Sequence, residues 1–316
     1  MDKIREEQSI KNGVAGKADF DDIYDRPDPR AYYRELGAYD YAVPHHGQRV
    51  FRHVLDALDT EQATVVDLCC SYGVNAALLK HDLELADLYD HYRSERWAEL
   101  SPEELARIDR EFYSDKRLPN APDVVGLDSA AHAIDYALDV GLLDAGSSEN
   151  LEETDPSPGL AASLDDVDLL TVTGGIGYVT ERTFDRLMSC TQPERRPWVA
   201  SLCLRTVPFD PIADCLASYG LVTEQLEDVT FPQRRFTSEE EQQHALEALA
   251  ARGLSPEGRE AEGCYHVNVY LSRPVEDTLE RSVSDILTDL VDATEPGTDG
   301  HDPTANLDRA APEASN

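Results

Sequence analysis

The chain has 316 residues, 41% of them hydrophobic, and a formal net charge of −35 at pH 7. This length allows one large hydrophobic core, and the composition is that of a globular protein. No apolar run approaches the ~18 residues that a membrane-spanning helix needs, and the first residues lack the apolar core of a signal peptide. We therefore expect a cytoplasmic protein with no membrane partner.

The negative charge is spread over the whole chain, and only five of the 28 basic residues are lysines. No basic stripe is available to neutralise phosphates, which argues against a nucleic-acid partner. An excess of acids with few lysines suits a protein that works in concentrated salt, where screening removes self-repulsion. We expect a halophile with an acidic proteome as the source; an ordinary acidic protein is the alternative.

The six cysteines form no C-x-x-C pair, and no histidine cluster has the spacing of a zinc site. We interpret all six as reduced thiols and expect no metal.

The order of apolar and polar segments predicts one core with appendages. Residues 1–27 are polar and mixed in charge, which predicts a flexible N-terminal arm, and 28–62 is expected to form a helical cover. The predicted core, 63–274, alternates helices with strands at 64–69, 123–127, 147–152, 167–172, 198–204, 221–229 and 264–272. This alternation predicts an α/β fold with a Rossmann-like, doubly wound, mainly parallel seven-stranded sheet whose last strand is antiparallel.

Further helices are expected outside this alternation. A helical insertion is predicted over 82–120, because Ser101 and Glu104 form a capping box around Pro102. Another helix is expected over 238–252. A C-terminal helix over 275–293, apolar on one face, is a candidate for packing on the body or for forming a homodimer, and the Pro/Gly/Asp-rich tail 294–316 predicts disorder.

The most informative motif is Thr64-Val-Val-Asp-Leu-Cys-Cys-Ser-Tyr-Gly73. An apolar strand runs into the acid Asp67 and then into a turn of small residues that opens a helix. A second strand ends in Asp128. In open α/β sheets, ligands bind beyond the carboxyl ends of the strands, and an acid after the second strand accepts hydrogen bonds from ribose hydroxyls. The motif therefore predicts an adenosine-containing ligand.

This arrangement resembles motif I of the class I S-adenosylmethionine-dependent methyltransferases, in which three alternate glycines follow the acid. Only Gly73 remains of these glycines. Cys69 and Ser71 replace the other two, and neither adopts a positive φ as easily as glycine does. The resemblance extends from about Thr64 to Pro274, with a long gap before Asp128 that the insertion accounts for.

The resemblance implies S-adenosylmethionine as the cofactor and a set of residues that contact it. Motif I and the end of the second strand would hold the methionine and ribose parts, with Ser129 as cap of the next helix. The loops after the third and fourth strands would approach the adenine and the transferred methyl group. The residues assigned in this way are Asp67, Cys69, Ser71, Gly73, Asp128, Ser129, Asn150, Leu151, Thr173, Gly174 and Gly175.

Segments that flank the sheet provide candidates for contact with the methyl acceptor. Each histidine of the pair at 45 and 46 would suit a general base, although a solvated histidine at a helix start is the simpler interpretation. The arginine pair at 234 and 235 would suit an anionic acceptor or would pair with nearby carboxylates. The candidates are Tyr41, His45, His46, Tyr178, Arg234 and Arg235, and no catalytic residue is assigned.

The leading prediction is a methyltransferase that moves a methyl group to an O, N or S atom of a small molecule. The methyl of a sulfonium is a strong electrophile, so positioning of the acceptor is the main task of the protein. One alternative is a non-catalytic cofactor-binding or scaffold protein with the same fold. A third is an NAD(P)-dependent oxidoreductase, which the absence of G-x-G-x-x-G after the first strand disfavours.

Overall fold

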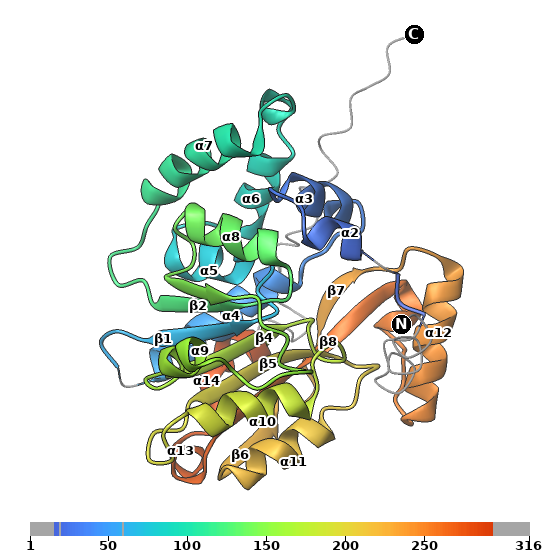
Figure 1. Ribbon diagram of the computed structural model, residues 1–316. Helices are drawn as coiled ribbons and strands as arrows, with labels where there is room; N and C mark the ends of the chain where they lie inside the picture. The colour runs from blue at the N-terminus through green and yellow to red at the C-terminus, as the bar shows by residue number, and fades with distance from the viewer. Residues whose placement is uncertain (1–15, 19, 59, 293–316) are drawn as a thin grey trace.

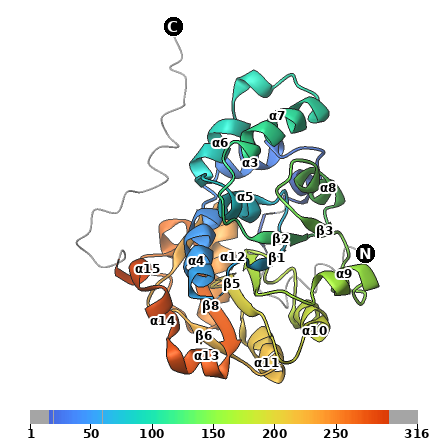
Figure 2. The ribbon, with the colours of Figure 1, turned by 90° about the vertical axis from the view of Figure 1, so that its left-hand side faces the viewer.

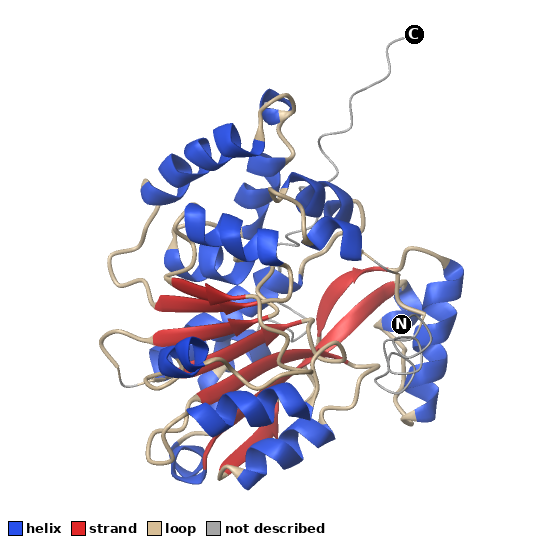
Figure 3. Ribbon diagram, in the orientation of Figure 1, coloured by secondary structure: helices blue, strands red, loops and turns tan. Residues whose placement is uncertain are grey.

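An eight-stranded β-sheet runs through the molecule, with helices on both of its faces (Figures 1 and 3). The computed structural model describes residues 16–18, 20–58 and 60–292. The strands are β1 (Thr64–Leu68), β2 (Asp123–Leu127), β3 (Ala145–Ser147), β4 (Leu169–Thr173), β5 (Trp198–Leu204), β6 (Leu221–Gln225), β7 (Phe231–Arg235) and β8 (Cys264–Pro274).

The sheet has the strand order β3-β2-β1-β4-β5-β8-β6, and β7 also pairs with β8. Neighbouring strands from β3 to β5 are parallel, whereas β8 runs antiparallel to β5, β6 and β7. This confirms the mainly parallel, doubly wound sheet with an antiparallel last strand. The chain leaves β1 in one direction to β2 and β3 and returns on its other side to β4. Ligands in open α/β sheets bind at such a reversal of strand order.

The helices on the sheet fall into two groups (Figure 2). Helices α4 and α5 pack together on one face, and α10 and α11 pack together on the other. No helix in the described ranges is long and apolar enough to cross a membrane. The bounds are α2 (Asp21–Tyr24), α3 (Arg30–Gly37), α4 (Val43–Ala57), α5 (Val74–Lys80), α6 (Leu85–Tyr92), α7 (Pro102–Ser114), α8 (Ala131–Asp139), α9 (Pro158–Ser163), α10 (Glu181–Cys190), α11 (Asp210–Ser218), α12 (Glu239–Ala251), α13 (Val275–Glu280), α14 (Val283–Ile286) and α15 (Thr288–Asp292).

The expected N-terminal arm is shorter than 27 residues. Residues 1–15 lie outside the described part of the chain, but α2 packs on the body, and Ile23 is only 2% exposed. The Tyr72 hydroxyl donates a hydrogen bond to the Ile23 carbonyl oxygen at 2.9 Å and accepts one from the Arg26 amide at 2.8 Å. The segment from Ile23 to Arg26 is therefore held by the buried Ile23 side chain and by two hydrogen bonds between its backbone and Tyr72.

The predicted insertion forms α6 and α7 and leaves the sheet undisturbed. The capping box of Ser101 and Glu104 is present at the start of α7. Asp109 in α7 is fully buried, and it accepts hydrogen bonds from Tyr136 Oη in α8 at 2.8 Å and from His91 Nε2 in α6 at 2.6 Å. This network ties the insertion to α8, and β1 and β2 pair in continuous register although the insertion separates them in the sequence.

The single helix expected over 275–293 is divided. The apolar residues over 275–291 belong to three short helices, α13, α14 and α15, because Ser282 and Asp285 form a capping box that starts a new helix. Leu279 is 82% exposed, whereas four later apolar residues are buried on the body: Val283, Ile286, Leu287 and Leu290. The predicted tail, 294–316, lies outside the described residues.

The strand expected over 221–229 ends at Gln225, and a further strand that was not predicted, β7, follows at Phe231–Arg235. Asp228 has a φ of 62°, which marks the turn between β6 and β7. Pro232 lies within β7, and a proline is tolerated there because the strand pairs only with β8 and is an edge strand. This additional strand is the reason that the sheet has more strands than the sequence predicted.

Candidate functional site

The turn after β1 has the backbone shape of a glycine-rich loop although two of its residues are not glycine. Cys69 and Ser71 have φ values of 59° and 49°, and Gly73, which precedes α5, has a φ of 74°. The left-handed conformation costs a non-glycine residue about 1–2 kcal/mol. Hydrogen bonds from the Cys69 and Cys70 amides to the Leu127 carbonyl oxygen, at 2.7 and 3.2 Å, tie the turn to the end of β2.

Asp128, directly after β2, completes this turn. Its Oδ2 accepts a hydrogen bond from the Ser71 amide at 2.8 Å, and its Oδ1 accepts one from the Ala130 amide at 3.0 Å. Burial raises the pKa of this carboxyl, although the side chain keeps some accessible surface. The expected capping role of Ser129 is wrong, because Ser129 is exposed and the start of α8 has Ala130 as its N-cap, with no capping hydrogen bond from a side chain.

Asp67 lies deeper than expected. Its Oδ1 accepts hydrogen bonds from Asn75 Nδ2 and Thr171 Oγ1, both at 2.9 Å, and the residue is fully buried. Burial raises the pKa of this carboxyl to about 7, even though the two hydrogen bonds act in the opposite direction. We correct its expected contact with a ligand to a positioning role, because Asp67 joins β1, α5 and β4 from within the core.

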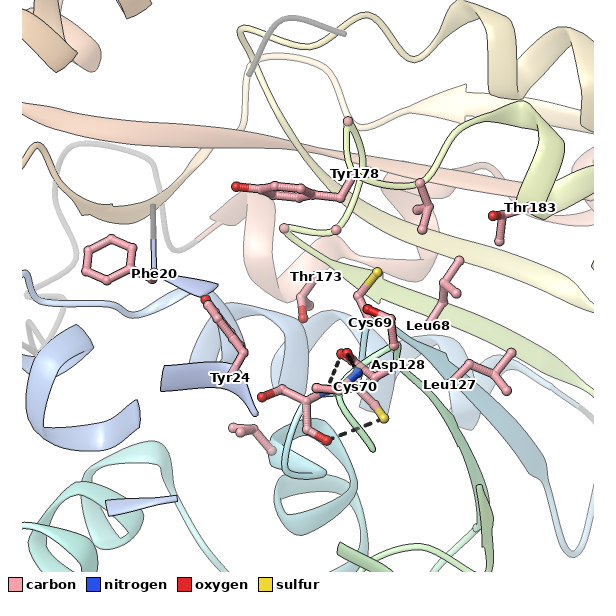
Figure 4. Close-up of a pocket in the computed structure, with 18 of the residues that line it drawn as sticks. Phe20, Tyr24, Leu68, Cys69, Cys70, Leu127, Asp128, Thr173, Tyr178 and Thr183 are labelled. Atoms are coloured by element: carbon pink, nitrogen blue, oxygen red, sulfur yellow. Dashed lines mark hydrogen bonds between the residues drawn. The ribbon is translucent and has the colours of Figure 1, made fainter. Parts of the chain in front are cut away.

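A cavity of about 600 Å³ opens at the carboxyl ends of β1, β2 and β4, where the strand order reverses (Figure 4). Its volume falls within the usual range of small-molecule sites. Asp67 and Gly73 do not line it, and Gly73 instead faces Ala137 and Leu142 in the core. The other predicted cofactor residues do line it: Cys69, Ser71, Asp128, Ser129, Asn150, Leu151, Thr173, Gly174 and Gly175.

The loop after β3 borders the cavity and is fixed to the start of α10. The strand expected over 147–152 lies earlier, as β3 over Ala145–Ser147, so Asn150 and Leu151 belong to the loop that follows it. Glu152 in this loop accepts hydrogen bonds from the Thr180 amide and hydroxyl, both at 2.8 Å. Sequence reasoning missed Glu152, whose role depends on a partner 28 residues away.

The loops after β1 and β4 fit closely together. A Cβ atom on Gly175 would lie 2.6 Å from Cys69 Sγ, so the absence of a side chain at 175 makes room for the thiol. Thr173 Oγ1 accepts a hydrogen bond from Asn75 Nδ2 at 3.1 Å, and Gly174 has a φ of 69°. The backbone of this glycine-rich loop therefore reaches the cavity directly.

Aromatic side chains line the other end of the cavity. In Figure 4, Phe20 and Tyr24 lie on one side of Thr173 and Asp128 lies on the other. Tyr178 lies above Thr173 in this view. Tyr41 also lines this end, as predicted. Phe20 and Tyr24 come from the segment that was expected to be a flexible arm, and no motif in the sequence marks them as part of a site.

Arg234 lines the cavity, but its charge is already matched. Its guanidinium pairs with the Glu241 carboxylate through hydrogen bonds of 2.6 and 3.1 Å. The Ala18 amide donates to the same carboxylate at 2.8 Å. Burial opposes ionisation of Glu241, but hydrogen bonds from Arg234, Thr237 and Ala18 lower the pKa of its carboxyl to about 2. Of the two interpretations of Arg234, the structure shows the ion pair.

Three of the predicted acceptor contacts lie away from the cavity. His46 is 7% exposed and stacks on Phe231 of β7 at 4.7 Å, and burial lowers the pKa of its imidazole to about 3. Neither His45 nor Arg235 lines the cavity, and Arg235 pairs with Asp40 at 2.6 Å. The role of general base at 45 or 46 is therefore a wrong expectation.

The sheet order, the acid after β2 and the cavity over β1 and β4 together match what the sequence resemblance implies. The chain has a Rossmann-like, doubly wound α/β fold, in which Cys69 and Ser71 adopt the left-handed conformation at the positions where the resemblance implies glycines.

Comparison with known proteins gives matches among solved structures. The plantazolicin methyltransferase BamL, in complex with a triazolic desmethyl-plantazolicin analogue and S-adenosylhomocysteine, is 11% identical over 77% of this chain and 88% of its own, at a TM-score of 0.40. The magnesium protoporphyrin IX methyltransferase ChlM from Synechocystis PCC 6803, with bound S-adenosylmethionine, is 12% identical over 84% and 96%, at 0.38. The [4+2]-cyclase SpnF is 13% identical over 72% and 81%, at 0.34. No family model and no curated protein matches the chain.

Proposed function

We propose that the protein binds S-adenosylmethionine in this cavity and transfers its methyl group to an O, N or S atom of a small molecule. The observation that supports this most directly is that the Asp128 carboxylate is held in place and still lines the cavity. Backbone amides hold both of its oxygens, yet each oxygen keeps a second lone pair for a ribose hydroxyl. The carboxylate is thus preorganised and still reachable from the cavity.

The other lining residues suit the same cofactor. Leu127 and Leu151 offer apolar surface to the adenine, and the loop from Thr173 to Gly175 would face the reacting methyl. When bound, the cofactor supplies an electrophilic methyl on a sulfonium. The role of the chain is to exclude water and to align the acceptor for direct displacement.

The charge of the cavity favours this cofactor over a nicotinamide dinucleotide. Carboxylates of Asp128, Glu149 and Glu152 line the end near β2 and β3. A pyrophosphate needs amide or cationic partners, whereas these acids would repel it. A cationic sulfonium cofactor has no such conflict.

A cofactor-binding protein without methyl transfer is the second candidate. The strained backbone at Cys69 and Ser71, where the family has glycines, favours it. Fluorescence titration with NADH and calorimetry with S-adenosylhomocysteine test the cofactor class. Transfer of label from [methyl-¹⁴C]S-adenosylmethionine across a panel of hydroxyl, amine and thiol compounds then tests the activity. We expect S-adenosylhomocysteine to bind, NADH not to bind, and at least one compound to be labelled. Binding without any labelling supports the second candidate, and binding of NADH alone contradicts both.

A further inference from the structure

The end of the cavity away from Asp128 is built from aromatic rings. We call it the aromatic end. It contains Phe20, Tyr24 and Tyr178, which Figure 4 labels, and Tyr41, which lines the same cavity and packs with Tyr24 on Tyr32. Tyr178 is 53% exposed, and the other three keep part of their surface accessible. Tyr24 and Tyr41 are braced from behind by edge contacts with Tyr32, at centroid distances of 5.6 and 6.2 Å. Braced aromatic rings that line a cavity favour a flat aromatic ligand.

A lysine lies at the same end. The Nζ of Lys17 is 5.4 Å from the centroid of the Tyr178 ring, and Lys17 lines the cavity. The charged groups that face it are the Arg234 guanidinium and the Glu241 carboxylate, which already pair with each other. Ala18, the next residue, is fixed by the hydrogen bond of its amide to Glu241.

Most of the acids that line the cavity follow β2 and β3, and Asp25 follows Tyr24. The former include Asp128, Glu149 and Glu152, and Asp25 accepts a hydrogen bond from the His132 amide in α8 at 2.9 Å. The aromatic end therefore combines aromatic rings with the amine of Lys17. An O–H acceptor loses a proton when it is methylated, and an amine in the cavity can accept that proton.

We propose, on the basis of the proposed function, that the acceptor is a phenol or a hydroxylated heteroaromatic ring that lies against the aromatic end with its hydroxyl directed to Lys17. In the reaction, the O–H bond breaks and the proton passes to Lys17 Nζ. The oxygen then forms a bond to the methyl carbon as the sulfur–methyl bond breaks. The sulfonium becomes a neutral thioether, and the positive charge is left on the lysine.

The state of Lys17 agrees with this role. Burial and the neighbouring Arg234 charge lower the pKa of its ammonium to about 7, although Glu241 acts in the opposite direction. A neutral amine is then available near neutral pH to accept a proton from a phenol, whose own pKa is about 10.

Binding tests the acceptor class without any need for turnover. Phenol, 4-methylphenol and 2-naphthol are titrated into the full-length protein against cyclohexanol, 4-methylcyclohexanol and decahydro-2-naphthol, with and without saturating S-adenosylhomocysteine. We expect each aromatic compound to bind roughly tenfold more tightly than its saturated partner, since two ring faces are stacked. Equal affinities, or no binding of any phenol, overturn the proposal. If S-adenosylhomocysteine itself fails to bind, the proposed function fails. The difference in affinity between each aromatic compound and its saturated partner, measured without S-adenosylhomocysteine, still tests this inference.

Variants test the role of Lys17. For a phenol that is labelled, we expect kcat/KM to rise as pH passes through about 7, where the lysine loses its proton. In Lys17→Met this rise should move toward the ionisation of the phenol itself, about 10. Lys116→Met is the matched control, because Lys116 also lies over an aromatic ring, at 5.6 Å from Phe112, and does not line the cavity. An unchanged pH profile in Lys17→Met overturns the proton transfer.

Discussion

The close fit between Gly175 and Cys69 gives a prediction that tests the geometry of the site. Gly175→Ala places a Cβ atom 2.6 Å from Cys69 Sγ and 2.8 Å from Cys69 Cβ. The φ of Gly175 is not among the positive values, so the backbone itself accepts alanine. Any destabilisation therefore reports the contact with Cys69 and, to a smaller extent, with Val172, whose Cγ2 would be 3.1 Å away.

The magnitude follows from two opposing effects. Forcing extra atoms into a packed site costs typically about 1–3 kcal/mol. Replacing glycine by alanine at a compatible position stabilises by about 0.4–1 kcal/mol through the unfolded chain. In Cys69→Gly, both contacting atoms of the cysteine are gone, so Gly175→Ala should be close to neutral or stabilising. The double-mutant cycle should therefore show a coupling of about 1–3 kcal/mol.

Urea unfolding of the four full-length proteins measures the coupling. Gly159→Ala is the matched control, because a Cβ atom there would only make ordinary contact with Ser157 Oγ at 3.8 Å. Its effect should be the same in the natural protein and in the Cys69→Gly variant. If Gly175→Ala and Cys69→Gly instead add to within about 0.5 kcal/mol, the two loops do not interlock as described.

Further variants, at Asp67 and at the Arg234–Glu241 pair, test charges near the cavity. Asp67→Asn keeps the acceptor oxygen for Asn75 and Thr171 and removes the buried ionisation. The folded state holds the Asp67 proton up to a pKa of about 7, above the ordinary 3.8. The contribution of the buried, protonated Asp67 carboxyl to the stability of the fold is thus complete below about pH 4 and is lost as pH rises through about 7. Urea unfolding should show the variant gaining stability relative to the natural protein between pH 5 and pH 8. Glu241→Ala leaves the buried Arg234 charge unpaired and should cost about 3–5 kcal/mol in the same assay, whereas Glu241→Ala with Arg234→Met should cost less than the two single changes together.

The same unfolding measurements can contradict the expectation for Asp67 and the expectation for the Arg234–Glu241 pair. An equal stability difference at pH 5 and pH 8 would show that Asp67 is ionised in the folded protein over this range. Additive costs for Glu241→Ala and Arg234→Met would show that the ion pair contributes nothing beyond its separate side chains.

The sheet was predictable because its signals are local. Apolar runs locate β1, β2 and β5 to within a residue, and the order of the strands places Asp128 beside the first turn. The capping box at Ser101 likewise fixes the start of α7. The capping box of Ser282 and Asp285 is equally local, and it shows that the apolar pattern beyond Pro274 should have been divided into separate helices.

The acceptor side was not predictable, because distant segments build it. Phe20 and Tyr24 belong to a short helix and its N-terminal cap, without an apolar periodicity, and Tyr72 fixes this segment from 49 residues away. His46 occupies the first turns of α4, where solvent exposure is the usual expectation, but β7 covers it with Phe231. These placements depend on long-range packing, of which the sequence pattern has no local sign.

Titration calorimetry with S-adenosylhomocysteine tests the central claim, that Asp128 holds the ribose of the cofactor. The natural protein should bind, and Asp128→Ala should weaken binding by about 1–3 kcal/mol through lost charged hydrogen bonds. Asp168→Ala is the matched control, because its carboxylate accepts a hydrogen bond from the Thr64 amide at 2.9 Å at the other end of β1, away from the cavity. We expect natural affinity in Asp168→Ala and weaker binding only in Asp128→Ala. Absence of binding in the natural protein, or equal affinity in the folded Asp128→Ala variant, contradicts this claim.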